Sequence, residues 1–383
     1  MARILLGISG SIAAYKAPLL VRLLVEQGHE VSTVLSQSAE KFVTPLSLAT
    51  VSGSEVLTQA SFFSHTIPHL ERQADVLLVA PATANMLAKF ALGLADDVLS
   101  TVFLSFRGPK IVAPAMHTEM WENPIVQEHI VRLRGLGVWV VGPDSGDLAC
   151  GDVGVGRMVD INLLGLAVNV CLLTGLDFFG QRLLITAGGT KESLDSMRVL
   201  TNRSTGQLGE KLAHLAMFYG AEVRLITTVP IHIQHPGLEV ILVSSFSEMQ
   251  EALHTHLEWC TRLYMAAAVS DFTMIPSDKK LKRKPEGLSL SLDATPDLLS
   301  EMSSQKGDRV FVGFCLDDGE LLTVAREKLL KKGLDYIVAN RPESVGATHR
   351  SIHVLSRTDQ AIHTLENASL LEVVYSILNW TKN

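Results

Sequence analysis

One cysteine of the chain lies in a glycine-rich stretch that could bring a thiol to a ligand. Residues 142–160 read GPDSGDLACGDVGVGRMVD and place five glycines and one proline around Cys150. This composition predicts a loop rather than a helix or a strand, and such a loop can close over a bound molecule. The alternative is a glycine-rich connector in which Cys150 has no chemical task.

A second candidate lies near the N-terminus, where residues 7–16 read GISGSIAAYK. An apolar run at residues 3–6 precedes this motif, and a helical pattern of leucines follows it. A glycine turn between a strand and a helix presents free backbone N–H groups and a positive dipole end to a phosphate. A plain tight turn remains the alternative, because such a glycine spacing alone is a weak signal.

Two segments of the second half carry further candidates. Roughly twenty mostly polar residues, 187–206, separate a strand from a helix where α/β proteins usually have a short turn, and a loop of that length is more often functional than slack. Residues 279–284 read KKLKRK, with five cations in six positions. On composition alone, this run is typical of a solvated loop.

Apolar runs that alternate with helical patterns predict the elements that position these residues. In the first half, strands are expected at residues 3–6, 30–35, 75–80, 110–113 and 138–141. In the second half, they are expected at 182–186, 222–228, 239–243, 263–267, 310–313 and 336–339, with edge strands at 288–292 and 352–355. This alternation predicts parallel doubly wound sheets, which bind ligands beyond the carboxyl ends of their strands.

Length and composition limit the function classes. A chain of 383 residues with 47% hydrophobic content suits two domains, expected at 1–178 and 179–383. A net charge of -7 argues against nucleic-acid binding. No apolar run reaches the roughly 18 residues of a membrane span, and the N-terminus lacks a secretory signal. The four cysteines form no CxxC pair, so a cytoplasmic location is expected.

Motifs along the whole chain resemble those of the bifunctional phosphopantothenoylcysteine decarboxylase and phosphopantothenate–cysteine ligase of bacterial coenzyme A synthesis. The first half contains GISGSIAAYK, FVTPLSL, APATAN, PAMHTEMW and ACGDVGVGRM. The second half contains TAGGTKESLD, TNRSTGQLG, AAVSDF, KKLKRK, VGFCLDD and DYIVAN. The resemblance implies an α/β protein with two Rossmann-like doubly wound domains, the first a flavodoxin-like flavoprotein and the second of the ligase type.

The first half is similar to the FMN-containing cysteine decarboxylases, and this likeness implies where the flavin lies. FMN contacts are implied for Ser9, Gly10, Ser11, Ala13, Ser36, Ala82, Thr83 and Asn85. In the family's reaction, FMN oxidises the cysteinyl thiol to a thioaldehyde, carbon dioxide leaves, and FMNH2 reduces the resulting enethiol. Cys150 would supply the proton needed at carbon, which a thiol with a pKa of about 8.5 can do when a closed loop places it.

The likeness also implies a base and substrate contacts. The family's base is a histidine in a segment like HIDLxxWAD, and residues 67–75 here read IPHLERQAD. His69 is the match, although its spacing to the aspartate is two residues shorter, and His65 is the alternative. Substrate contacts are implied for Met116, His117 and Arg157. His117 replaces an asparagine and can still donate a hydrogen bond, whereas Asp96 in the triplet 95–97 removes an amide donor.

The second half resembles the ligase, which activates 4'-phosphopantothenate with CTP as an acyl-cytidylate that the amine of cysteine attacks. This likeness implies that Asn202 contacts the acyl intermediate and that Lys280 is a catalytic lysine, which makes the basic run functional. Nucleotide contacts are implied for Asp271, Lys280, Pro296, Asp297, Leu298, Phe314, Lys328 and Lys332. Mg²⁺ is expected to offset phosphate charge together with the lysines, without assigned ligands. Gly189 stands where proline is usual, and residues 272–274 lack the usual Arg-Pro.

The resemblance further implies a homo-oligomer in which decarboxylase trimers are joined through ligase dimers, up to a dodecamer, with each FMN at a subunit interface. The expected partners are small molecules, namely 4'-phosphopantothenate, cysteine and CTP. One alternative is a protein with only one active half, because the His69 segment is shortened. Another is a flavin-binding regulatory subunit, against which the Cys150 stretch and the ligase motifs argue.

Overall fold

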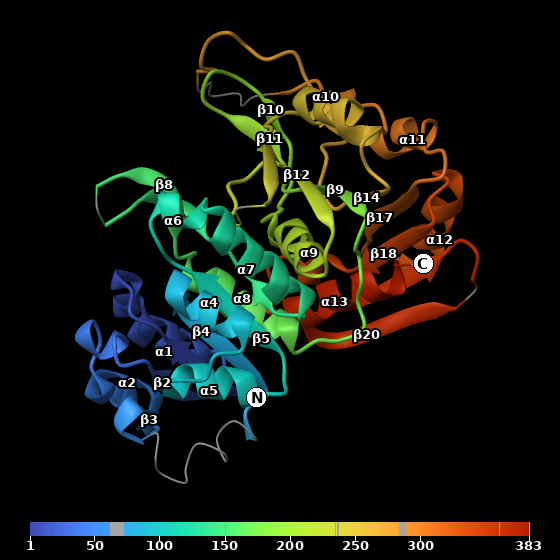
Figure 1. Cartoon of the computed structure of the whole chain (residues 1–383). Coiled ribbons are helices and arrows are strands. Elements are labelled where there is room, and N and C mark those ends of the chain that lie inside the picture. Colours follow the sequence, from blue (N-terminus) through green and yellow to red (C-terminus); the bar gives the residue numbers. More distant parts are fainter. Residues whose placement is uncertain are drawn as a thin grey trace. The chain divides into compact units, whose positions relative to one another are not determined.

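The computed structural model describes residues 1–61, 73–149, 151–233, 235, 237–282, 289–359 and 361–382. The chain divides into two compact units, coloured from blue to green and from green to red in Figure 1. The first comprises residues 1–174 with a short segment at 233–236, and the second comprises residues 175–232 and 237–383. Each unit is described by itself.

The first unit is built on a parallel sheet with the strand order β3-β2-β1-β4-β5-β6. Its strands are β1 Arg3–Ile8, β2 Glu30–Leu35, β3 Val56–Leu57, β4 Val76–Ala82, β5 Lys110–Pro114 and β6 Trp139–Val140. All residues of β4 are buried, as expected for a central strand covered on both faces. The predicted parallel doubly wound sheet is confirmed, and without the two-residue β3 its order is flavodoxin-like.

Helices cover both faces of this sheet. Helices α4, α5 and α7 share one apolar cluster with β1 and β4, whereas α1 packs against α8. The helical segments are η1 Ile12–Lys16, α1 Ala17–Glu26, η2 Ala39–Lys41, α2 Pro45–Ser52, η3 Gln59–Ser61, α4 Ala84–Leu92, α5 Val98–Ser105, α6 Thr118–Trp121, α7 Pro124–Gly135 and α8 Ile161–Cys171. Several begin at a side-chain cap, such as Thr83 before α4 and Asp160 before α8, which explains where they start.

The glycine-rich stretch around residue 150 is not the loop that its composition predicts, and this prediction was wrong. Strands β7 Asp144–Asp147 and β8 Val153–Arg157 form an antiparallel ribbon. A Cβ atom at Gly154 would lie 2.2 Å from the Thr118 hydroxyl oxygen, and one at Gly156 would lie 2.1 Å from the Met116 carbonyl oxygen. These glycines therefore let a strand pack closely on the 116–118 segment, a use of strand glycine that composition does not reveal.

The second unit is built on a larger sheet with the order β13-β12-β9-β14-β17-β18-β19-β20. Its strands are β9 Arg182–Ala187, β12 Glu222–Thr227, β13 Glu239–Leu242, β14 Arg262–Met265, β17 Val310–Leu316, β18 Tyr336–Asn340, β19 His349–Ser356 and β20 Ile362–Ser369. The pairs from β13 to β18 are parallel, and β19 and β20 are antiparallel. A second parallel α/β sheet is thus confirmed, with an antiparallel margin added.

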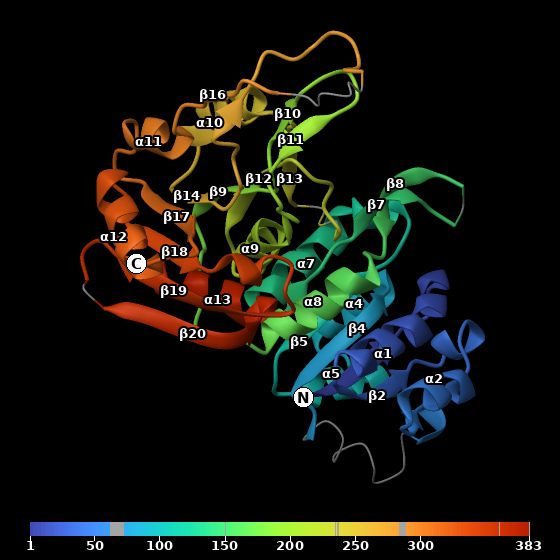
Figure 2. The same cartoon turned by 180° about the vertical axis from the view of Figure 1, so that it is seen from behind.

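Helices also lie on both faces of this sheet. Helices α10, α11 and α12 contribute to one apolar cluster, and α13 contacts α9 on the other face, as Figure 2 shows. The helical segments are α9 Gln207–Phe218, α10 Phe246–Leu257, α11 Leu298–Ser303, α12 Leu321–Lys331, η4 Pro342–Ser344 and α13 Leu370–Trp380. None of the helices in the described ranges is long and apolar enough to cross a membrane.

Two short antiparallel ribbons complete the second unit, and one of them lies next to a strand that was predicted at the wrong residues. The polar loop after β9 contains the hairpin of β10 Lys191–Ser193 and β11 Val199–Thr201. The edge strand expected at 288–292 was wrong, since residues 289–292 have no regular structure. The pairing instead joins β15 Phe272–Thr273 to β16 Asp293–Ala294. The strand expected at 352–355 is confirmed within β19.

Candidate functional site

The strand order of the first unit reverses between β1 and β4, which defines the switch point where doubly wound sheets bind ligands. Buried Ser9 joins the two loops that leave these strands. Its hydroxyl donates to the Pro81 carbonyl oxygen at 2.7 Å and accepts from the Thr83 N–H at 2.9 Å. Ser9 therefore fixes the spacing of the two loops that flank the switch point.

A cavity of about 860 Å³ opens in the first unit beside these loops. This volume lies within the roughly 300–1,000 Å³ typical of small-molecule and cofactor sites. The structure brings residues from the ends of β1, β4 and β5 and from β8 to its wall. The predicted site residues that line it are Gly10, Ser11, Ala13, Thr83, Asn85, Met116, His117 and Arg157.

The other predicted flavin contacts do not line this cavity but lie beside it. Ser9 and Ala82 are buried at the switch point. Ser36 is buried as well, and its hydroxyl lies 3.2 Å from that of Ser38, which does line the cavity. Direct contact with a bound ligand is therefore better supported for Ser38 than for Ser36.

Some lining residues have no assigned role in the sequence-based prediction. These are Ile12, Tyr15, Lys16, Ser38, Phe42, Ala84, Ala115, Met120, Asp147, Leu148, Ala149, Gly156 and Met158. Lys16 ends the GISGSIAAYK motif and adds a cation to the wall. The motif could therefore have indicated Lys16 as a site residue from the sequence. The turn after β1 leads first into η1, which Ser11 caps, and only then into α1. The close approach of the 36–38 segment requires Gly10, since a Cβ there would lie 2.3 Å from the Ser38 hydroxyl oxygen.

The ribbon of β7 and β8 contributes one wall of the cavity. Arg157 forms an ion pair with Asp144 at 2.9 Å across the ribbon. Backbone bonds from Leu148 to Asp152 and from Gly151 to Leu148 close the tip. Cys150 follows Ala149 of the cavity wall in the sequence and lies outside the described residues. His65 and His69 also lie outside the described residues.

Gly156→Ala is expected to weaken FMN binding by about 5- to 150-fold. Its Cβ would lie 2.1 Å from the Met116 carbonyl oxygen, and forcing that contact costs about 1–3 kcal/mol. The ribbon would then move from the segment that carries Met116 and His117. Fluorescence titration of the FMN-free protein with FMN measures the effect. Gly135→Ala, which has no atom within 4 Å of its new Cβ, is the control, and equal affinities of the two variants would contradict the packing argument.

Asp96, the departure noted in the triplet 95–97, lies outside the cavity lining. Its carboxylate forms an ion pair with Lys89 at 2.7 Å, and this contact lowers the pKa of Asp96. Asp97 contacts the same ammonium at 2.6 Å and caps α5. Both carboxylates therefore have a local structural partner.

In the second unit, side chains and backbone bonds join the loops that follow β9, β14 and β16. The Asn202 amide donates to the carbonyl oxygens of Ala268 and Val269 at 3.3 and 3.1 Å. Thr295 donates from its N–H to the Asp271 carbonyl oxygen at 3.0 Å. The predicted residues Asn202, Asp271 and Pro296 are thus brought to one region. Close packing explains why residue 189 is a glycine, because a Cβ atom there would lie 2.8 Å from the Asn202 carbonyl oxygen.

A second group of predicted residues surrounds the carboxyl end of β17. Lys332 forms an ion pair with Asp297 at 2.9 Å, and Asp297 caps α11, whose first residue is the buried Leu298. Lys328 lies near Cys315, where burial raises the pKa of the thiol and the lysine opposes that shift. Phe314 is half-buried beside Cys315 on the same strand.

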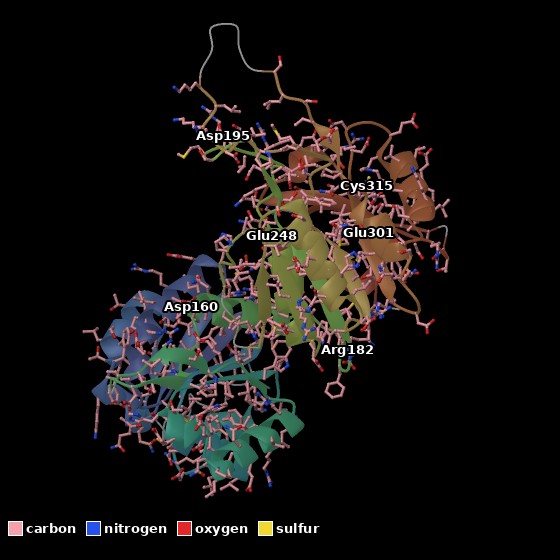
Figure 3. The ribbon with its side chains drawn as sticks, turned by 90° about the horizontal axis from the view of Figure 1, so that it is seen from above. Asp160, Arg182, Asp195, Glu248, Glu301 and Cys315 are labelled. Atoms are coloured by element: carbon pink, nitrogen blue, oxygen red, sulfur yellow. The ribbon has the colours of Figure 1, made fainter. Side chains whose placement is uncertain are left out.

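Lys280 is exposed, and the segment that carries it is tied to the β10–β11 hairpin. The buried Asp195 carboxylate accepts from the Leu281 N–H at 2.9 Å and from the Arg198 guanidinium at 2.9 Å. Arg198 in turn donates to the Leu281 carbonyl oxygen at 3.0 Å. Figure 3 shows Asp195 on the outer arm of the unit, apart from Cys315. Asp195 and Arg198 therefore hold the N–H and the carbonyl oxygen of Leu281, the residue next to Lys280. Residues 283 and 284 of the basic run lie outside the described ranges.

Asp195→Asn is expected to lower the rate of ligation at least tenfold by releasing the Lys280 segment. The bond from Leu281 and the charge of Arg198 lower the pKa of Asp195, so the carboxylate is ionised at neutral pH and an amide cannot reproduce its contacts. Pyrophosphate release measures ligation. Asp278→Asn, which removes an exposed carboxylate of the same segment, is the control. A normal ligation rate in Asp195→Asn would show that the contact does not position Lys280.

Within the described ranges, no group of three or more histidine, cysteine, aspartate or glutamate side chains is arranged to hold a metal ion. Mg²⁺ commonly binds through one or two carboxylates together with substrate phosphates. Its ligands therefore remain unassigned.

Two family models match the two halves of the chain separately. Residues 1–169 match the family model "Flavoprotein", and residues 178–383 match "DNA/pantothenate metabolism flavoprotein C-terminal domain". The coenzyme A biosynthesis bifunctional protein CoaBC of Bacillus subtilis (strain 168) is 38% identical over 353 residues, which cover 90% of this chain and 87% of the relative.

Two solved structures are each similar to one half of the chain. The C-terminal domain of a CoaBC protein is 26% identical and covers 53% of this chain and 94% of its own, with a TM-score of 0.45. The FMN binding protein AtHal3 is 35% identical and covers 44% of this chain and 95% of its own, with a TM-score of 0.40. The chain belongs to the family of CoaBC bifunctional proteins of coenzyme A biosynthesis. This follows from its identity to the B. subtilis relative and from the second family model, which matches more than half of the chain.

Proposed function

We propose that this chain condenses 4'-phosphopantothenate with cysteine and then decarboxylates the product to 4'-phosphopantetheine. The observation that carries the proposal is the cavity at the switch point, whose wall gathers the residues implied by the resemblance from four separate segments. Membership of the bifunctional family supports the pairing of this site with a ligase in the second half. The domains would be residues 1–178 for decarboxylation and 179–383 for ligation.

The cavity residues suit FMN. Gly10 lets the loop after β1 approach the 36–38 segment, Lys16 offers a cation to a phosphate, and Ser11, Thr83 and Asn85 offer polar atoms. When bound, FMN would supply the oxidation and reduction of the cysteinyl group. Met116, His117 and Arg157 would orient the substrate between the flavin site and the β7–β8 ribbon.

Two residues outside the described ranges would move protons. His69, with His65 as the alternative, would act as the base in the step that loses carbon dioxide. Cys150, which follows Ala149 in the sequence, would donate a proton to carbon afterwards. A histidine that can be replaced by asparagine without loss of carbon dioxide release is not the base.

In the second half, CTP would convert the carboxylate of 4'-phosphopantothenate into an acyl-cytidylate and release pyrophosphate. Oxide is a poor leaving group, whereas CMP is a good one, so the amine of cysteine can then attack the carbonyl carbon. Asn202 would contact the acyl group, and Lys280, Lys328 and Lys332 with Mg²⁺ would offset phosphate charge. Asp271, Phe314 and residues 296–298 would complete the nucleotide site.

Decarboxylase trimers joined through ligase dimers would form the homo-oligomer, and the protein would act in the cytoplasm. The regulatory-subunit alternative is not favoured, because it gives the ligase half no task.

A direct test of the first half uses purified protein and phosphopantothenoylcysteine. We expect a yellow protein that contains FMN and releases carbon dioxide from this compound. A colourless protein that neither binds added FMN nor releases carbon dioxide would contradict the decarboxylase assignment. Normal pyrophosphate release in the same preparation would leave the ligase assignment standing.

A further inference from the structure

The second unit contains a cavity of about 280 Å³ to which the proposed reactions give no task. It lies between the start of α12, the segment after β18, and strands β19 and β20, with Leu321, Arg341 and Arg350 among its lining residues. None of the residues proposed for ligation lines it. Strand β18 is parallel to β17 and ends here, so the cavity lies at the carboxyl edge of the parallel part of the sheet, where such sheets bind ligands.

The lining is rich in cations and hydrogen-bond donors. Arg341 and Arg350 outnumber the single carboxylate, Glu343, and two imidazoles, His349 and His353, are also present. Hydroxyl groups come from Ser344 and Ser351. Guanidinium groups present several N–H donors in a fixed plane and bind phosphate and carboxylate oxygens.

The two guanidinium groups are not neutralised by neighbouring acids. The Arg341 Nη1 atom donates to the Asp318 carbonyl oxygen at 3.2 Å, and the Arg350 Nη2 atom donates to the Ala347 carbonyl oxygen at 2.8 Å. Within the described part of the chain, neither arginine forms an ion pair, in contrast to Arg157, Arg198 and Arg224. Both therefore keep their charge for another partner.

Arg350 gives the strongest indication that this cavity binds an anion. It is half-buried, and its Nε atom is fully buried without a hydrogen-bond partner in the structure. Burial lowers the pKa of this guanidinium, which marks the cost of removing an unpaired cation from water. The pairing of β19 with β20 shifts register between Arg350 and Ile352, and such bulges often re-aim side chains beside binding sites.

We propose that this cavity binds the phosphate group of a small molecule, with Arg341 and Arg350 as its main contacts. An anion would neutralise the excess positive charge and supply oxygen acceptors to donors that the protein leaves without an acidic partner. The volume admits a phosphate with a few attached carbon atoms rather than a whole nucleotide. This site does not depend on the ligase assignment, because it shares no residue with it.

Calorimetric titration of the FMN-loaded full-length protein with inorganic phosphate and with glycerol 3-phosphate tests the proposal. We expect Arg350→Gln and the exposed Arg341→Gln each to weaken one binding event at least tenfold relative to the unmodified chain. Arg357→Gln, which changes an arginine of the same unit outside the cavity, should retain it. Tighter binding of glycerol 3-phosphate would identify an organic phosphate as the ligand, and equal binding would identify free phosphate.

Acetate serves as the carboxylate probe. If acetate saturates the site and phosphate does not, the phosphate assignment is wrong. If both arginine variants bind phosphate as the unmodified chain does, the cavity is not an anion site. Circular dichroism of each variant shows whether a lost binding event reflects the cavity or a lost fold, and Arg341→Gln preserves the test if Arg350→Gln does not fold.

Discussion

Cys150→Ser is expected to bind FMN normally and to stop turnover after carbon dioxide has left, so that the enethiol accumulates. The reason is that a hydroxyl is a much weaker acid than a thiol, and loss of a general acid typically costs about 10²- to 10⁴-fold in rate. The ribbon that carries residue 150 would remain docked, since its packing depends on Gly154 and Gly156. Carbon dioxide release and 4'-phosphopantetheine formation, followed separately, measure the two halves of the reaction.

Cys171→Ala is the matched control for this prediction. Cys171 is buried in α8, and burial raises its pKa to about 12, so this thiol is a poor proton donor at neutral pH. Its variant should complete the reaction at a normal rate. Full turnover of Cys150→Ser would refute the role of Cys150 as the proton donor.

Lys280→Gln is expected to reduce ligation by about 10²- to 10³-fold, because removal of a charge that stabilises a transition state costs this much in related chemistry. Decarboxylation of supplied phosphopantothenoylcysteine should continue, since all of the described residues that line the cavity at the switch point belong to the first unit. Pyrophosphate release with CTP, and carbon dioxide release from the supplied compound, separate the two effects.

Lys279→Gln provides the control, because it removes the adjacent exposed ammonium and leaves Lys280 in place. It should affect ligation only slightly. Equal ligation rates for Lys280→Gln and the unmodified chain would remove Lys280 from the mechanism.

The central strands could be predicted from the sequence because their burial leaves a continuous apolar signal. Strand β4 is buried throughout, and β9 is buried after its first residue, so each reads as an uninterrupted run between polar breaks. Strand β20 gave no such signal, because most of its residues are exposed at the margin of the sheet. The glycine ribbon was misread because its strand pairing depends on a contact with residues 116–118, which are distant in the sequence.

Much of the lining of the cavity at the switch point could be predicted because its residues follow strand ends, which a parallel sheet brings to one edge. Other contacts have no local signature. Asp195 meets Leu281 across 86 positions of the chain, and nothing in either segment announces this bond. The buried Nε atom of Arg350, which has no hydrogen-bond partner in the structure, likewise becomes visible only when its neighbours are placed, since the sequence does not show which arginines lack an acid.

Incubation of the full-length protein with 4'-phosphopantothenate, cysteine, Mg²⁺ and CTP tests the proposed function most directly, with pyrophosphate and carbon dioxide followed together. We expect pyrophosphate to appear first and carbon dioxide to follow, with 4'-phosphopantetheine as the final product. ATP in place of CTP should give much less of both. Pyrophosphate without carbon dioxide, or neither product from protein that contains FMN, would contradict a bifunctional enzyme.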